Sequence, residues 1–149
     1  MRIAIASDHG GFPLKADLTQ WLQAEGHEVL DLGAHQLEPD DDYADYARYV
    51  GQAIQHDQAD RGVLLCGSGV GACVAANKMK GVRASVCHDA YSAHQGVEHD
   101  ALNVLCLGAR VIGPSLAVDL VKAFLSATYQ PAPRFERRLE KVRAIEATP

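Results

Sequence analysis

Five short and mainly apolar runs, each followed by a segment of helical character, constrain the fold of this chain more than any other feature. The runs cover Ile3–Ala6, Val29–Leu32, Val63–Cys66, Val82–Cys87 and Asn103–Leu107. Strands that read as continuous apolar runs are buried on both faces, which is typical of a parallel sheet between two helical layers. The sequence therefore predicts an α/β fold: a doubly wound, five-stranded parallel sheet, Rossmann-like, with helices on both faces.

The segments between and after these runs have helical patterns. Helices are expected from Leu14 to Glu25, Tyr43 to Ile54, Ala90 to about His99, Pro114 to Leu125 and Arg134 to about Glu146. The last of these follows a break at two prolines and forms a C-terminal helical extension. A chain of 149 residues has the usual size of one domain, so we expect a single domain over residues 1–149.

Charge and residue counts exclude several classes of protein. The net charge of −5 argues against a general nucleic-acid binder, which needs a basic surface. No apolar run approaches the roughly 20 residues of a membrane span, and the first run is too short for the core of a signal peptide. The 4 cysteines form no C-x-x-C pair and the 7 histidines no H-E-x-x-H pattern, which disfavours a metal site. We expect a cytoplasmic protein that binds neither nucleic acid, nor membrane, nor metal.

A parallel sheet of this kind binds ligands beyond the carboxyl ends of its strands. The residues that follow the predicted strands at that edge are Ser7–Gly11, Cys66–Gly71, Cys87–Asp89 and Gly108–Arg110. They include a carboxylate, imidazoles, a thiol, a guanidinium and several glycines. The candidate site is therefore expected at this edge.

The glycine-rich turn from Gly67 to Gly71 is the sharpest local signal, and it opens a helix that is expected to run through Lys78. Glycines between a strand and a helix leave backbone N–H groups free to face one point, where they can hold a phosphate or an oxyanion. The turn matches neither a Walker A loop, nor the dinucleotide fingerprint, nor the G-x-S-x-G elbow. A tight strand–helix connection explains it equally well.

Three residues near these turns, and one at the end of a predicted helix, could carry chemistry. Cys66 directly precedes the glycine-rich turn, where a helix N-terminus can lower the pKa of a thiol so that it acts as a base; the alternative is a core thiol. Asp8 and His9 end the first strand, where polar side chains are costly without a purpose, although Asp8 could cap the next helix. His99 ends a helix, and a surface histidine near the helix dipole is the commoner explanation there.

Two further segments of the chain carry charges of opposite sign. Arg134 and Arg138 share one face of the last helix and suit a phosphate dianion, although Glu136 and Glu140 could pair with the basic residues there. The acidic segment Glu38–Asp42 is expected to be a solvated loop.

Together these motifs resemble a known family along nearly the whole chain. The segments that carry this resemblance are Ala6–Lys15, Asp42–Tyr43 with Asp45–Ala47, Cys66–Gly71, Ala76–Lys78, Arg83–Ala84, Cys87–Asp89, Glu98–His99, Asn103–Leu105 and Gly108–Gly113. These segments are long, ordered and jointly specific. With them the chain resembles type B ribose-5-phosphate isomerase, in the group that also contains galactose-6-phosphate and allose-6-phosphate isomerases.

The resemblance implies a metal-independent aldose–ketose isomerase, without a cofactor, that interconverts ribose 5-phosphate and ribulose 5-phosphate through a cis-enediolate. Cys66 stands where many members carry the base, whereas others use a glutamate at the place of Cys73 or its neighbours. Ser68 stands where a hydroxyl moves protons at O1 and O2, and His99 where the sugar ring is opened. The amides of the turn (Gly67, Gly69, Val70 and Gly71) would form the oxyanion hole.

The resemblance also implies the binding residues and the assembly. Asp8 would bind sugar hydroxyls, and the phosphate would be bound by His9, Arg110, Arg134 and Arg138, some of them from a neighbouring subunit. Members are homodimers, sometimes tetramers, with the site at the subunit interface. The helix over 134–146 is accordingly expected to pack on a partner subunit.

One position in the substrate-binding set departs from the family pattern. Asn usually follows the ring-opening histidine, whereas Asp100 follows His99 in this chain. An ionised carboxylate accepts hydrogen bonds only, and its charge opposes an enediolate. In the productive complex we expect Asp100 to be protonated or turned away from the reacting oxygens, and a charged His99 could pair with it and hold it away from the substrate. A hexose-6-phosphate isomerase (allose or galactose) and a catalytically silent sugar-phosphate-binding protein remain alternatives.

Overall fold

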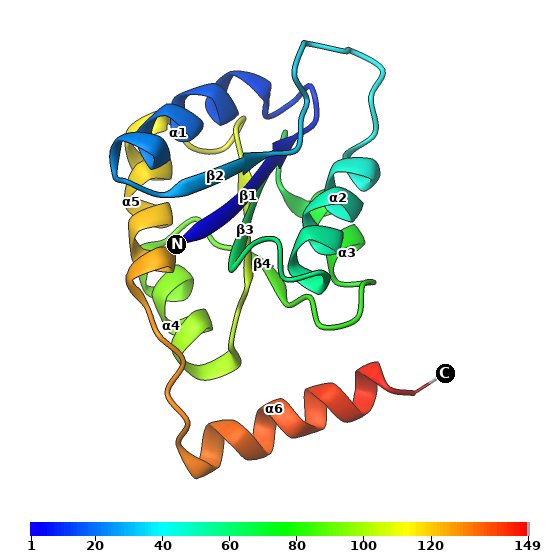
Figure 1. Cartoon of the computed structure of the whole chain (residues 1–149), viewed down its shortest axis with the longest axis vertical. Coiled ribbons are helices and arrows are strands. Elements are labelled where there is room, and N and C mark those ends of the chain that lie inside the picture. Colours follow the sequence, from blue (N-terminus) through cyan, green and yellow to red (C-terminus); the bar gives the residue numbers. More distant parts are fainter. Residues whose placement is uncertain (149) are drawn as a thin grey trace.

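The computed structural model describes residues 1–148 and has the predicted α/β architecture (Figure 1). The strands are β1 (Arg2–Ser7), β2 (Glu28–Asp31), β3 (Arg61–Cys66), β4 (Ala84–Val86) and β5 (Val104–Gly108). The helices are α1 (Phe12–Ala24), α2 (Tyr43–Gln55), α3 (Val70–Ala76), α4 (Ala90–Asp100), α5 (Pro114–Ser126) and α6 (Pro133–Glu146). Strand and helix alternate as expected from the sequence.

The strands form one parallel sheet in the order β2-β1-β3-β5-β4. Successive connections run to opposite sides of β1, so the order reverses between β1 and β3. In open parallel sheets a crevice opens at such a reversal, at the carboxyl ends of the strands. Because Ser7 is paired with Leu65, the residues that follow β1 and β3 emerge side by side in this crevice.

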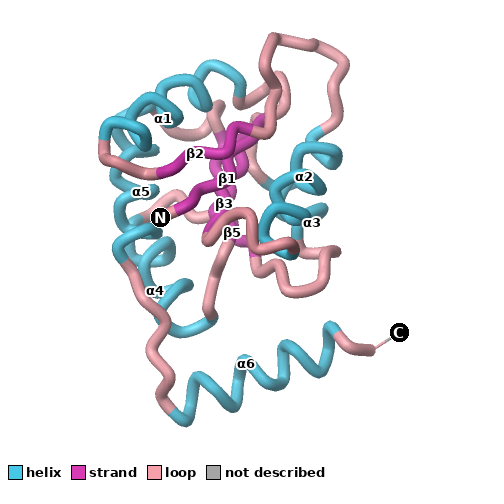
Figure 2. Tube along the Cα trace, in the orientation of Figure 1, coloured by secondary structure: helices cyan, strands magenta, loops and turns pink. Residues whose placement is uncertain are grey.

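Two helical layers cover the sheet, as Figure 2 shows. Helices α1, α4 and α5 lie on one face, where Leu18, Leu105 and Phe124 are fully buried. Helices α2 and α3 lie on the other face, where small residues such as Ala47 and Ala76 are fully buried. A sheet buried on both faces explains why its strands read as apolar runs.

Helix α6 stands apart from these layers and lies across the end of the molecule opposite the carboxyl edge of the sheet (Figures 1 and 2). It buries Phe135 and Leu139, while Val142 and Ile145 are exposed, Ile145 by 75%. Among the described residues, no helix has both the length and the apolar character that crossing a bilayer requires.

Two elements are shorter than the sequence predicts. Helix α3 ends at Ala76 rather than Lys78, and β4 covers three residues instead of the predicted Val82–Cys87. The Asn77 side chain causes part of this difference: its Nδ2 donates to the Ala84 carbonyl at 2.8 Å and its Oδ1 accepts the Ala84 N–H at 2.9 Å. A side chain thus takes the place of strand partners at the outer edge of β4.

Candidate active site

The carboxyl edge of the sheet brings Asp8 and Cys66 into contact. Asp8 is only 4% exposed, and its Oδ1 accepts the N–H groups of Gly10 and Gly11 at 2.9 and 3.2 Å. The Cys66 thiol, at the end of β3, donates to Asp8 Oδ2 at 3.1 Å. The carboxylate is therefore held rigidly by backbone amides on one side and contacts the thiol on the other.

The pKa of Cys66 is shifted in the direction opposite to the one the sequence suggests. Burial, followed by the hydrogen bond to Asp8 and the charge of its carboxylate, raises the pKa of the Cys66 thiol. The N–H groups of Gly69 and Gly67 act in the other direction, but they do not outweigh the first three effects. The expected lowering by the turn thus operates, and the buried carboxylate overrides it.

The glycine-rich turn has a backbone that only glycine adopts easily. Gly69 has a φ of 82°, and a Cβ atom there would lie 3.0 Å from the Leu107 carbonyl carbon. Ser68 is exposed, and its Oγ accepts the Val70 N–H at 3.3 Å, which leaves the hydroxyl proton free for a ligand. The turn is therefore pressed against the end of β5 with its one hydroxyl toward solvent.

Arg110 joins this cluster from the loop after β5. Its backbone N–H donates to the Gly67 carbonyl at 3.0 Å, and its side chain packs on Gly67, 3.5 Å from the place of a Cβ atom. Two polar residues of this edge bind the backbone instead: His88 Nε2 accepts the Gly108 N–H at 3.0 Å, and Asp89 caps α4 by accepting the Ser92 N–H at 2.7 Å. The Arg110 guanidinium is therefore the cation that lies beside the glycine-rich turn.

His9 adds a second basic group at this edge. Its Nδ1 lies 2.7 Å from Asp41 Oδ1, in the loop that connects β2 to α2. The prediction that Glu38–Asp42 is a solvated loop is therefore wrong for Asp41, whereas it is confirmed for Glu38 and Asp42, which are exposed. Composition could not separate one acidic residue from its neighbours, because the difference depends on how the loop returns to the sheet.

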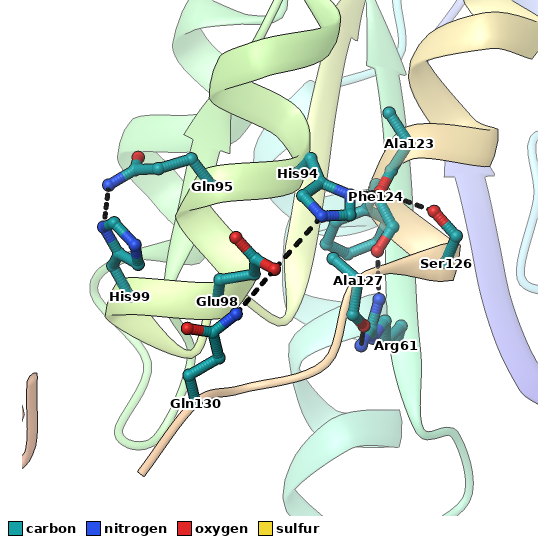
Figure 3. Close-up of polar contacts among 10 residues, drawn as sticks. All are labelled: Arg61, His94, Gln95, Glu98, His99, Ala123, Phe124, Ser126, Ala127 and Gln130. Carbon is teal, nitrogen blue, oxygen red and sulfur yellow. Dashed lines mark hydrogen bonds and ion pairs between the residues drawn. The ribbon is translucent and has the colours of Figure 1, made fainter. Parts of the chain in front are cut away.

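His99 belongs to a second cluster, at the other end of the sheet. Its ring stacks on Phe135 of α6 with centroids 4.0 Å apart and planes inclined by 20°. Gln95 Nε2 lies 2.6 Å from His99 Nδ1, one turn earlier on α4 (Figure 3). The Arg134 guanidinium lies over the Phe135 ring at 4.4 Å from its centroid. Phe135 thus joins His99 and Arg134; sequence reasoning missed it, although it starts the apolar face of the last helix.

Asp100 and Arg138 are exposed near this second cluster. Asp100 ends α4, and the expected ion pair with His99 is not formed: His99 Nδ1 contacts Gln95 instead. Within residues 1–148, no ion pair involves α6, so neither Glu136 nor Glu140 neutralises Arg134 or Arg138. The basic face of α6 is therefore open to an anion.

Within one chain, the two clusters lie at opposite ends of the sheet. Asp8, His9, Cys66, the glycine-rich turn and Arg110 follow the carboxyl ends of strands, whereas His99 and Asp100 end a helix that runs back to the start of β5. A single copy does not bring together all the residues that the resemblance assigns to the site. The described part of the chain also contains no group of three or more His, Cys, Asp or Glu residues that could hold a metal ion.

Comparisons with known proteins agree with this architecture. The ribose/galactose isomerase family matches residues 3–142. Ribose-5-phosphate isomerase B of Escherichia coli K12 is 43% identical over 145 residues, covering 97% of this chain and 96% of that protein. D-erythrulose-4-phosphate isomerase of Pectobacterium atrosepticum is 39% identical over 140 residues, covering 92% of each. The crystal structure of ribose-5-phosphate isomerase B from Mycoplasma genitalium with bound ribulose 5-phosphate has a TM-score of 0.92 at 38% identity, covering 99% of this chain and 97% of that one. Because the family match and these relatives span nearly the whole chain, the protein belongs to the ribose/galactose isomerase family.

Proposed function

We propose that this protein is a metal-independent isomerase that interconverts ribose 5-phosphate and ribulose 5-phosphate through a cis-enediolate. The observation that carries the proposal is the Cys66 thiol, buried at the mouth of a glycine-rich turn and in contact with Asp8. A relative with 38% identity has been crystallised with ribulose 5-phosphate, which supports the choice of sugar. Binding alone would require no base at this place.

In the proposed reaction the Cys66 thiolate removes the proton from C2 of the aldose and returns it to C1. The charge left on the substrate resides on O1 and O2 of the enediolate, where the amides from Gly67 to Gly71 stabilise it. Losing one such donor typically costs about 3 kcal/mol in the transition state. The Ser68 hydroxyl, with its proton free, moves protons between O1 and O2.

Asp8 has two roles in this proposal. It binds sugar hydroxyls, and it is the group nearest to the thiol, so it can accept the thiol proton as the substrate enters. Since its Oδ1 is occupied by the amides of Gly10 and Gly11, only Oδ2 is available for either role. The proton that Cys66 must lose to act as a base is therefore the one that it donates to Asp8 Oδ2.

The site is proposed to be completed by a second copy of the chain. His9 and Arg110 of one subunit would meet Arg134 and Arg138 of the other around the phosphate, with His99 placed to open the sugar ring. The separation of the two clusters within one chain supports a shared site, because only a partner can supply the missing half. The exposed apolar residues of α6 support the packing of segment 134–146 on that partner, in a homodimer or a tetramer.

A tetrose phosphate is a second candidate substrate. D-Erythrulose-4-phosphate isomerases of two bacteria are 39% and 34% identical to this chain, close to the values for the ribose 5-phosphate relatives. Allose and galactose 6-phosphates are larger and would need a roomier pocket. One extra carbon changes selectivity by roughly 10- to 200-fold, so a direct comparison of substrates separates these candidates.

The test is an assay of all four sugar phosphates in heavy water, with and without EDTA. We expect the highest kcat/KM on ribose 5-phosphate, by about tenfold or more, with deuterium incorporated at C2 and no effect of the chelator. Saturable binding without exchange would identify a silent binding protein. A higher kcat/KM on erythrulose 4-phosphate would select the tetrose reaction, and activity that EDTA removes and one divalent ion restores would contradict metal independence.

Asp100→Asn is expected to raise kcat for ribose 5-phosphate about threefold to tenfold, the worth of one neutral hydrogen bond. The amide can donate to a substrate oxygen, and it removes a charge that repels the enediolate. Asp119→Asn, an exposed carboxylate on α5, serves as the control. A loss of activity on ribose 5-phosphate would instead indicate a sugar whose hydroxyl donates to Asp100.

A further inference from the structure

Asp41 differs from the other acidic residues of its loop. Its side chain is only 10% exposed, and its Oδ1 accepts the His9 backbone N–H at 2.9 Å in addition to the ring contact. Its Oδ2 is buried and has no hydrogen-bond partner among residues 1–148. Two contacts from one carboxylate oxygen, one to the backbone and one to the ring, fix both the position of His9 and the orientation of its imidazole.

This contact determines which nitrogen of His9 can bind a ligand. A carboxylate only accepts hydrogen bonds, so Nδ1 carries a proton where it contacts Asp41. Nε2 is then the ring nitrogen left for a ligand, and it donates a hydrogen bond when the ring is charged. The His9 side chain is 35% exposed, so a ligand can reach it.

Three charged groups face the His9 ring from three elements: Asp41 from the β2–α2 loop, Asp8 from the end of β1 and Arg110 from the loop after β5. The hydrogen bond to Asp41 raises the pKa of His9, and the charges of Asp8 and Asp41 act in the same direction. Desolvation and Arg110 oppose this shift. Burial acts to raise the pKa of Asp41, but the His9 backbone N–H and ring, together with Tyr46, outweigh it and keep that pKa below its usual value.

We propose that Asp41 is a positioning residue for phosphate binding, which holds the His9 ring beside Arg110 and favours its charged form. The inference rests on the proposed function, in which His9 and Arg110 contact the phosphate. Two cations repel each other before the anion arrives, and a buried carboxylate supplies the charge that offsets this repulsion. Tyr46 faces the same carboxylate; burial and Asp41 raise the pKa of Tyr46 to about 12, so it adds no charge near neutral pH.

Asp41→Asn tests this role, because the amide keeps the size and an acceptor oxygen but removes the charge. We expect KM for ribose 5-phosphate to rise about tenfold while kcat changes by less than about twofold. Charged His9 exists below its pKa, so phosphate affinity is lost as pH rises through that value. Without Asp41 this loss should begin at a lower pH. Asp40→Asn makes the same change of charge at an exposed neighbour and should leave KM and the pH profile unchanged.

Two further measurements distinguish positioning from a structural role. The titration of the His9 ring, followed by NMR and assigned with His9→Asn, should move to lower pH in Asp41→Asn and stay in place in Asp40→Asn. In a His9→Asn background, Asp41→Asn should raise KM no further, because it acts through His9. The inference would be overturned if the His9 titration did not shift in Asp41→Asn, or if the titration shifted while KM stayed unchanged.

The proposed function can fail independently of this inference. If the wild-type protein does not isomerise ribose 5-phosphate, the proposed function is wrong, and inorganic phosphate becomes the probe. Phosphate should then still perturb the His9 resonance in the wild type and bind about tenfold more weakly to Asp41→Asn. Equal affinity of the two proteins for phosphate would overturn the role of Asp41.

Discussion

Cys66→Ala is expected to lower kcat for the isomerisation by about a hundredfold or more, the typical contribution of a general base. The change removes one sulfur atom at the end of β3 and should alter the free energy of unfolding by only about 1 kcal/mol. Turnover and thermal unfolding of the same preparation check both parts of the expectation. A variant that kept more than a tenth of wild-type turnover would require another base.

Cys73 is the rival thiol and provides the sharpest comparison. Hydrogen bonding with Cys106, together with contacts from Val86 and Asn77, lowers the pKa of Cys73 to about 7, against the effect of burial. Its Sγ nevertheless lies 3.5 Å from the Ala84 carbonyl, on the β4 side of α3, whereas Cys66 contacts Asp8. We expect Cys73→Ala to retain activity, since position and not acidity selects the base. The opposite result would assign the base to α3.

The raised pKa of Cys66 also gives a pH signature. The thiolate is the reactive form, so kcat should rise with pH as the thiol ionises and level off above its pKa. Asp8→Asn removes the carboxylate that, after burial, raises this pKa most, so the rise should move to lower pH. A pH profile that is unchanged in Asp8→Asn would contradict the coupling of these two side chains.

The main features of the fold were predictable because they follow from local pattern. The central residues of β1, β3 and β5 are apolar since helices cover both faces of the sheet, and α1 ends just before Gly26, where the sequence indicates a stop. The short β4 was not predictable. Its length depends on the Asn77 and Asn103 side chains, which bind the backbone of Ala84 and Arg83 across 7 and 20 residues of sequence.

The residues of the site were predictable from the sequence, but the contacts between them were not. Polar residues after β1 and β3 could be expected at one edge, but the Asp8–Cys66 contact requires the register of Ser7 with Leu65. The direction of the Cys66 pKa shift depends on burial and on the contact with Asp8, and the sequence alone reveals neither. Nothing in the sequence distinguishes Asp41 from its three acidic neighbours in Glu38–Asp42, and the stacking of His99 on Phe135 depends on how α6 returns to α4.

Replacing Arg134 or Arg138 with alanine is expected to raise KM for ribose 5-phosphate about tenfold to a hundredfold, the worth of one charge-assisted hydrogen bond. Both guanidinium groups are exposed, and within the described residues neither has an acidic partner, so they are available to a phosphate dianion. Residual activity on the unphosphorylated sugar should hardly change. Arg137→Ala, on the same helix, is the matched control. Equal losses on both sugars would indicate a role in folding or assembly.

Subunit mixing decides whether these arginines act on the partner's thiol. If one site combines Cys66 of one subunit with Arg138 of the other, a hybrid dimer of Cys66→Ala and Arg138→Ala chains has one intact site and one doubly altered site. Random mixing should then restore about a quarter of wild-type activity at low substrate concentration, although each parent is nearly inactive. Were both groups to act within one chain, every hybrid site would lack one of them and mixing would restore nothing. Cys66 and α6 lie at opposite ends of the sheet within one chain, and this separation favours recovery of activity in the hybrid dimer.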